Sequence, residues 1–148
     1  MFRQIDYSDG LSRCAECEFF DEYAVYYYNT ISEKIEHLDR ILCELDVKRD
    51  HFQTYCYDYN YIPLPNMKIK ELRRNYIKQT NNRKLEKTFH GLDDEAFATA
   101  FFQLIQCNDI LSMDWKKYLY SEAKKTFLAW CNDNRITPMW QGKPYYGQ

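Results

Sequence analysis

The sequence has few residues that break regular structure, with 4 Gly and 4 Pro among 148 residues. Because glycine and proline end or kink helices, their scarcity favours long, uninterrupted helices. The same scarcity argues against a glycine-rich loop that would cradle a phosphate group. The sequence also lacks a nucleophile elbow, a P-loop, a zinc-protease motif and a dinucleotide-binding fingerprint. We therefore expect a protein that is not an enzyme and uses no cofactor.

Long hydrophobic runs are also absent. No apolar stretch approaches the roughly 18 residues that a membrane-spanning helix requires. The residues after Met1, FRQIDYSDG, are polar and do not resemble the apolar centre of a signal peptide. We expect no membrane partner and a cytoplasmic location, which for a viral gene is the host cytoplasm.

The near-neutral net charge of −2 hides an uneven distribution. Residues 1–60 hold 6 Lys and Arg against 13 Asp and Glu, whereas residues 61–90 hold 8 against 2. An acidic surface favours a basic partner, and a basic strip favours phosphate groups. The length fits one domain, so we expect a single helical domain over residues 1–148.

Residues 20–57 predict one long helix. Apolar residues recur at alternating steps of four and three, as in a heptad pattern. Opposite charges four residues apart, such as Glu36 and Arg40, favour an exposed helical face. The apolar seam would pack against the rest of the chain or pair with a second copy in a homodimer. Its members are Ala24, Tyr28, Ile31, Ile35, Leu38, Leu42, Leu45, Phe52 and Cys56.

The rest of the chain predicts three shorter helices, a connecting loop and irregular ends. The helix at 94–108 is apolar on several sides, which predicts a central buried position. Pro63 and Pro65 predict an extended loop near 58–65, and a short turn is expected at 83–89. The predicted fold is all-α, with the long helix packed against the others. The shorter helices cover about 67–80, 94–108 and 113–132, with N-caps at Asn66, Asp93 and Ser112.

The 14 tyrosines include two clusters, one at each end of the predicted long helix. Rigid aromatic side chains beside carboxylates are typical of protein interfaces. The alternative is that these tyrosines cover the ends of the helical core. The candidate protein-binding residues are Asp21, Glu22, Tyr23, Tyr26, Tyr27, Tyr57, Asp58, Tyr59 and Tyr61.

The basic strip between residues 68 and 87 offers an alternative function. Cations along one helical face would follow phosphate groups, and an interleaved tyrosine would stack on a base. A sequence pI of about 5.9 argues against a dedicated nucleic-acid-binding protein. The strip would otherwise be a solvated face or pair with the acidic helix. The candidate nucleic-acid-binding residues are Lys70, Arg73, Arg74, Tyr76, Lys78, Arg83 and Lys84.

Cys14 and Cys17 form a C-x-x-C pair. Zinc needs about four thiolate or imidazole ligands, and no second pair with suitable spacing follows. We expect reduced cysteines and no bound metal, and a zinc-stapled module is the alternative.

Together these features favour a protein-binding module. The specific hypothesis is a small phage or mobile-element accessory protein that inhibits a host nucleic-acid-handling or defence complex. In its size, composition and lack of a catalytic motif, the chain resembles small anti-CRISPR proteins, and that resemblance implies a host protein as partner. The alternative is a nucleic-acid-binding helical module that uses residues 68–87.

Overall fold

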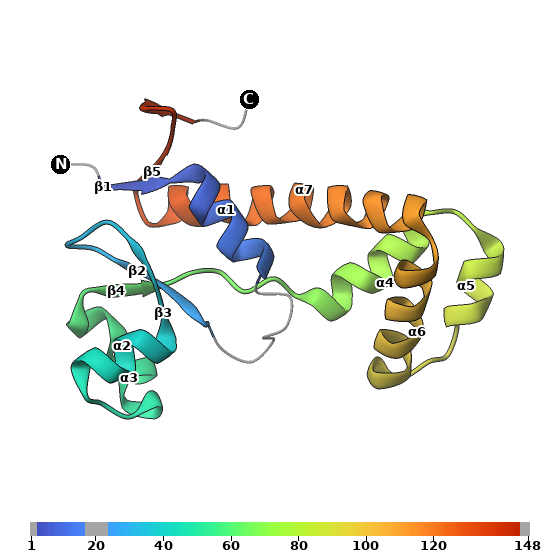
Figure 1. Ribbon diagram of the computed structural model, residues 1–148, viewed down its shortest axis with the longest axis horizontal. Helices are drawn as coiled ribbons and strands as arrows, with labels where there is room; N and C mark the ends of the chain where they lie inside the picture. The colour runs from blue at the N-terminus through green and yellow to red at the C-terminus, as the bar shows by residue number, and fades with distance from the viewer. Residues whose placement is uncertain (1–2, 17–23, 146–148) are drawn as a thin grey trace. The chain divides into compact units, whose positions relative to one another are not determined.

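A computed structural model describes residues 3–16 and 24–145 (Figure 1). The described residues form seven α-helices and six strands. The strands make two three-stranded sheets, so the prediction of an all-α fold is wrong although helix predominates. The chain divides into two compact units: unit 1 is Met1–Met67 with Ala123–Gln148, and unit 2 is Lys68–Glu122.

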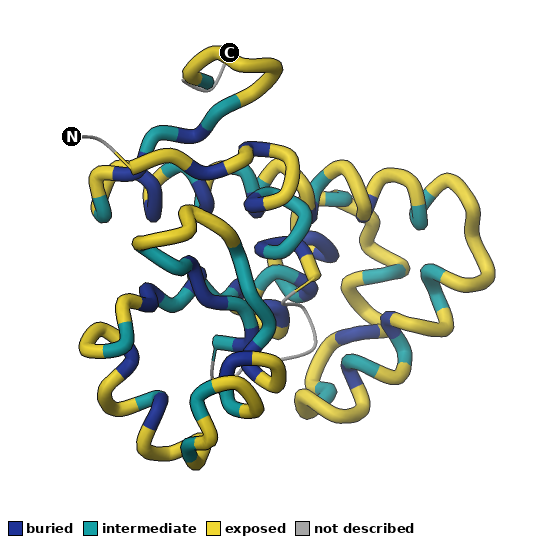
Figure 2. The backbone as a smooth tube through the Cα atoms, turned by 60° about the vertical axis from the view of Figure 1, so that its left-hand side comes forward, coloured by how far each residue is buried: buried dark blue, intermediate teal, exposed yellow. Residues whose placement is uncertain are grey.

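The first sheet of unit 1 has β2 (Tyr26–Asn29) in the middle. Its antiparallel neighbours are β3 (Ile35–His37) and β4 (Tyr61–Pro63). Three consecutive tyrosines favour a strand, because aromatic side chains pack well on a pleated surface. The two middle residues of β2 are buried. Figure 2 shows buried residues of the backbone in dark blue.

The long helix predicted for residues 20–57 is therefore wrong. After β2 and β3 the chain forms two short helices, α2 (Leu38–Leu45) and α3 (Arg49–Tyr55), and a 3₁₀ turn, η2 (Cys56–Tyr59). Asp46 ends α2 with a left-handed backbone, at φ 53° and ψ 48°. Within residues 24–57 there is thus no continuous heptad seam of the kind on which a homodimer was predicted.

The three-and-four spacing is nevertheless real within the short helices. Leu38, Ile41, Phe52 and Cys56 are all buried and form one cluster with Tyr27 and Tyr61. The spacing continues across the β2–β3 turn by coincidence, since Ile31 is 75% exposed there. Periodicity alone cannot distinguish one long helix from two short ones separated by a turn.

The second sheet of unit 1 joins segments that were predicted to be irregular. β1 (Arg3–Asp6) runs parallel to β5 (Ile136–Trp140), and β5 pairs antiparallel with β6 (Lys143–Pro144). Gln141 and Gly142, at φ 51° and 77°, form the two-residue turn between β5 and β6. The helix α1 (Tyr7–Glu16) follows β1 directly.

Two side chains connect the first sheet to other parts of unit 1. The Tyr28 hydroxyl donates a hydrogen bond to the Gln4 carbonyl oxygen at 2.6 Å. The Trp130 indole nitrogen donates to the Pro63 carbonyl oxygen at 2.9 Å, and the rings of Tyr28 and Trp130 lie 6.1 Å apart. The core of unit 1 therefore depends on residues from both ends of the chain.

Gly10 of α1 lies so close to Phe127 that a Cβ atom would overlap the aromatic ring. Phe127 is fully buried and packs against Tyr7 and Trp130, with centroids 6.1 and 6.0 Å away, so its ring has little room to move. We expect Gly10→Ala to lower the free energy of unfolding by ~1–3 kcal/mol, as overpacking does. Urea denaturation measures this.

The control is Ser8→Ala, because Ser8 is exposed on the same helix and its substitution should change stability by less than about 0.5 kcal/mol. A Gly10→Ala variant at least as stable as the wild type would contradict the close approach. In that case the better helix propensity of alanine would outweigh the overlap.

Unit 2 contains α4 (Ile69–Gln79), α5 (Arg83–Phe89), α6 (Asp94–Cys107) and the first part of α7 (Asp109–Asp133). The three predicted shorter helices are confirmed to within a few residues, and the turn predicted at 83–89 is the helix α5. The cap at Asp93 is also confirmed, since its carboxylate accepts from the Ala96 amide at 2.8 Å.

The other two predicted caps are wrong. The residue before α4 is Lys68, and no side chain caps that helix. At α7 the Asn108 side chain accepts from the Leu111 amide at 3.0 Å, four residues before the predicted cap at Ser112. Asn108 and Ser112 are both good capping types, so residue type alone does not locate the first turn.

The core of unit 2 is aromatic. The ring of Tyr76 lies 5.4 Å from Trp115, and Phe101 lies 4.8 Å from Trp115. The helix α6 is not central as predicted, because only Phe97 and Phe101 are buried and Phe102 is 40% exposed. Part of the apolar surface of α6 is thus left exposed.

Candidate protein interface

An aromatic surface lies on α3 and η2 of unit 1. It comprises His51, Tyr55, Tyr57 and Tyr59. The side chains of Tyr55 and Tyr57 are 48% and 66% exposed, which is unusual for large aromatic residues. We call these four residues the aromatic surface.

Contacts within unit 1 hold the aromatic surface in place. The His51 Nε2 atom and the Tyr59 hydroxyl share a hydrogen bond of 3.0 Å, and the His51 and Tyr55 rings lie 4.9 Å apart. Tyr59 also packs 6.0 Å from Phe52, which is fully buried. The exposed Tyr55 ring is therefore connected to a core residue through His51 and Tyr59.

The local sequence explains why Tyr57 points outward. The turn η2 ends at Asn60, whose left-handed backbone (φ 66°) lets its amide donate to the carbonyl oxygens of Cys56 and Tyr57. Asparagine tolerates this conformation well. Cys56 faces the core, so the adjacent Tyr57 and Asp58 face solvent.

Two of the predicted contact tyrosines belong to the core instead. Tyr27 and Tyr61 are 3% and 6% exposed, and their rings lie 4.9 and 5.5 Å from Phe52. The Tyr61 hydroxyl donates to the Glu36 carboxylate at 3.0 Å. Burial is the main cause that raises the pKa of each tyrosine to about 12. Neither side chain is available to a partner protein.

Tyr26 is half-buried in β2 and does not belong to the aromatic surface. Its hydroxyl donates to the Glu16 carboxylate at 2.9 Å, and the Arg13 guanidinium lies 4.9 Å from its ring. Burial, followed by the Glu16 carboxylate, raises the pKa of Tyr26. The remaining predicted contact residues, Asp21, Glu22 and Tyr23, lie outside the described residues.

The structure thus brings together Tyr57, Asp58 and Tyr59 of the predicted interface and adds His51 and Tyr55. The two added residues lie four apart on α3 and share one helical face. That spacing was present in the sequence, but the predicted interface included neither residue.

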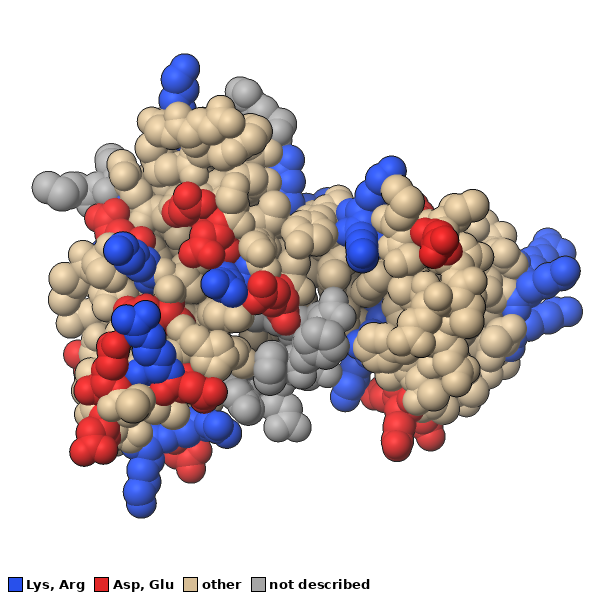
Figure 3. Space-filling view, viewed as in Figure 1, with Lys and Arg blue, Asp and Glu red and all other residues tan. Residues whose placement is uncertain are grey.

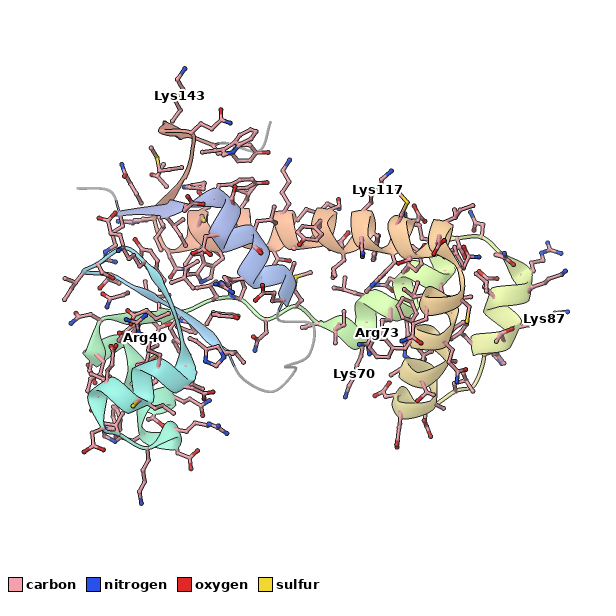
Figure 4. All side chains as sticks on the ribbon, viewed as in Figure 1. Arg40, Lys70, Arg73, Lys87, Lys117 and Lys143 are labelled. Carbon is pink, nitrogen blue, oxygen red and sulfur yellow. The ribbon has the colours of Figure 1, made fainter. Side chains whose placement is uncertain are left out.

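The predicted nucleic-acid stripe does not form as one row of accessible side chains. Tyr76 is 1% exposed, and its hydroxyl donates to the Asp114 carboxylate at 2.8 Å. Arg73 is 8% exposed, and Figure 4 shows it between α4 and α6, with its guanidinium 5.0 Å from the Phe102 ring centre. Arg74 forms an ion pair with Asp94 at 2.8 Å. Exposed side chains remain at Lys70, Lys78, Arg83 and Lys84.

The described residues contain no cluster of three or more His, Cys, Asp or Glu side chains arranged to hold a metal ion. Cys14 is buried in α1, whereas Cys17, its partner in the C-x-x-C pair, lies outside the described residues. Within residues 3–16 and 24–145, no helix combines the length and the apolar character needed to cross a bilayer.

Comparison of the chain with protein-family models, curated proteins and solved structures gives no match.

Proposed function

We propose that this protein is a non-catalytic protein-binding module whose aromatic surface contacts a partner protein. The exposed pair Tyr55 and Tyr57 carries this proposal. Tyrosine buries a large area at little cost in conformational entropy, and it is enriched among the residues that dominate binding energy. The Tyr55 ring, which packs on His51, loses little further freedom when a partner binds, because His51 is bonded to Tyr59 and Tyr59 packs on Phe52.

The charge of the surrounding chain supports a basic partner. Asp50 and Asp58 near the aromatic residues are balanced by Lys48 and Arg49, but residues 1–60 as a whole carry 13 acidic against 6 basic side chains. Complementary charge accelerates association with a positively charged protein, such as one that handles nucleic acid. The most specific form of the proposal is a small inhibitor, encoded by a phage or mobile element, of a host complex of that kind.

The double variant Tyr55→Ala/Tyr57→Ala is expected to weaken partner binding by about 30-fold or more, the loss typical of removing a hot spot. A tagged wild-type chain would first isolate partners from nuclease-treated lysate of the source cells. The affinity of the purified partner would then be measured by calorimetry for each variant. Because both side chains are exposed, the circular dichroism spectrum should not change.

The matched control is Tyr120→Ala, since Tyr120 is 47% exposed and belongs to unit 2, whereas the aromatic surface belongs to unit 1. Its affinity for the partner should equal that of the wild type. Equal loss in both variants, or no loss in the double variant, would contradict the proposed interface. Tyr61 must stay unchanged in this test, because its removal would open the core of unit 1.

A further inference from the structure

Unit 2 contains a groove formed by α4, α5 and the start of α6. One hollow of about 380 Å³ is lined by Arg74, Lys78, Glu86 and His90 over Phe89 and Phe97. A second hollow of about 300 Å³ is lined by Arg83, Glu86, Lys87 and His90. Since the hollows share Glu86 and His90, they adjoin, and we call them together the cationic groove.

Positive charge dominates this groove. Its walls hold four Lys and Arg side chains against the single carboxylate of Glu86. Figure 3 shows Lys and Arg gathered over α5, and Figure 4 shows Lys87 extending from that helix. Asp94 offsets part of the charge of Arg74, which leaves Lys78, Arg83 and Lys87 as the main source of potential.

The groove has an apolar floor and one pre-positioned guanidinium. The rings of Phe89 and Phe97 lie 4.7 Å apart, and the Arg74 guanidinium lies 4.5 Å from the Phe97 ring centre. One nitrogen of Arg74, Nη2, donates to the Leu92 carbonyl oxygen at 3.3 Å and to Asp94 at 2.8 Å. A guanidinium has five N–H donors, so others remain for an oxyanion.

We propose that the cationic groove binds the phosphate backbone of single-stranded nucleic acid. Each hollow has its own pair of cations, Arg74 with Lys78 and Arg83 with Lys87, which suits a ligand that repeats its phosphate group. A phosphopeptide with a single phosphate would occupy only one hollow. Both volumes lie near the lower end of the about 300–1,000 Å³ typical of ligand sites, a size suited to single nucleotides and not to a duplex.

This inference is independent of the proposed protein interface, because every residue of the groove belongs to unit 2 and the aromatic surface belongs to unit 1. An experiment can therefore contradict the proposed groove without contradicting the proposed protein interface, and the reverse. It also differs from the predicted stripe, since Arg73 and Tyr76 are excluded and Lys87 and His90 are included.

The test measures binding of a fluorescent oligothymidylate of about 20 nucleotides, longer than the site of most single-strand-binding folds, to the full chain by anisotropy. If all four cations contact phosphates, log K should fall with log salt at a slope of about −2.8, or about −0.7 per contact. The variant Lys78→Gln/Arg83→Gln/Lys87→Gln should bind at least about 10-fold more weakly, with a slope closer to zero by about 2.

The control variant Lys116→Gln/Lys117→Gln/Lys143→Gln removes the same charge from exposed positions outside the groove. It should bind within about twofold of the wild type, and so should Tyr55→Ala/Tyr57→Ala. Absence of binding, or an equal loss in the control, would overturn the proposal. Tighter binding of a duplex of equal length, or displacement of the oligonucleotide by a phosphopeptide at lower concentration, would also overturn it.

Discussion

Replacing Tyr76 with alanine is expected to unfold unit 2. The Tyr76 side chain is 1% exposed, and its ring packs 5.4 Å from Trp115 and 6.2 Å from Phe101. Its hydroxyl also donates a hydrogen bond to the Asp114 carboxylate. Removing a buried aromatic ring costs ~3–5 kcal/mol. That is a large part of the roughly 5–15 kcal/mol that stabilises a typical protein.

Hydrogen exchange with mass spectrometry checks this result, because it locates the loss along the chain. Amides of α4 and α6 should lose their protection, whereas those of β2 and β4 should keep it. Tyr76→Phe keeps the ring and should cost only about 1 kcal/mol, the net worth of one hydrogen bond. If Tyr76→Ala instead kept full protection and lost only oligonucleotide binding, Tyr76 would be the stacking residue predicted from the sequence.

Raising the pH from about 10 to 12 is expected to unfold the protein. Burial raises the pKa of Tyr7, Tyr27, Tyr28 and Tyr61 to about 12, and it raises the pKa of Tyr76 further. In the unfolded chain a tyrosine loses its proton near pH 10. Between these values the folded chain binds more protons than the unfolded chain. The free energy of unfolding therefore falls as the pH rises through this window.

A spectrophotometric titration of phenolate, followed together with circular dichroism, tests this expectation. The five buried tyrosines should lose their protons only as the protein unfolds. In denaturant, all tyrosines should titrate together near pH 10. A single reversible titration near pH 10 with an unchanged dichroism spectrum would contradict the buried positions of these phenols.

The helices α4, α6 and α7 were predictable because their signals are local. Asp93 followed by Asp94 and Glu95 identifies a helix start, and the spacing of Trp115, Leu119, Ala123, Phe127 and Trp130 identifies the buried face of α7. All five of those residues are buried. The mean spacing of 3.6 residues in a helix needs no information from the rest of the chain.

Unit 1 was not predictable in this way because its order is set by distant pairings. β2 is a strand because β3 and β4 flank it, and β1 pairs with a segment more than a hundred residues away. Strand preference depends strongly on such neighbours. The strand β5 also contains Pro138, which argues against a strand when the sequence is considered alone.

In the candidate sites too, features set by local sequence were predictable and features set by distant pairing were not. The tyrosines at 57, 59 and 61 look equivalent in the sequence, yet only the pairing of β4 with β2 places Tyr61 in the core. In the cationic groove, Arg74, Lys78 and Arg83 were predicted as nucleic-acid-binding residues of the basic strip. The sequence did not predict that the turn at residues 80–82 brings α5 and His90 beside α4.

The parallel pairing of β1 with β5 has a consequence for synthesis on the ribosome. Arg3 lies opposite Ile136, so β1 lacks its partner until the chain has grown by more than a hundred residues. At about 5–20 residues per second, this delay lasts roughly 7–27 seconds. The residues of unit 2 are continuous in sequence and emerge within that interval. The nascent chain should therefore complete unit 2 first and carry β1 as an open strand edge, a natural target for chaperones, until the last strands appear.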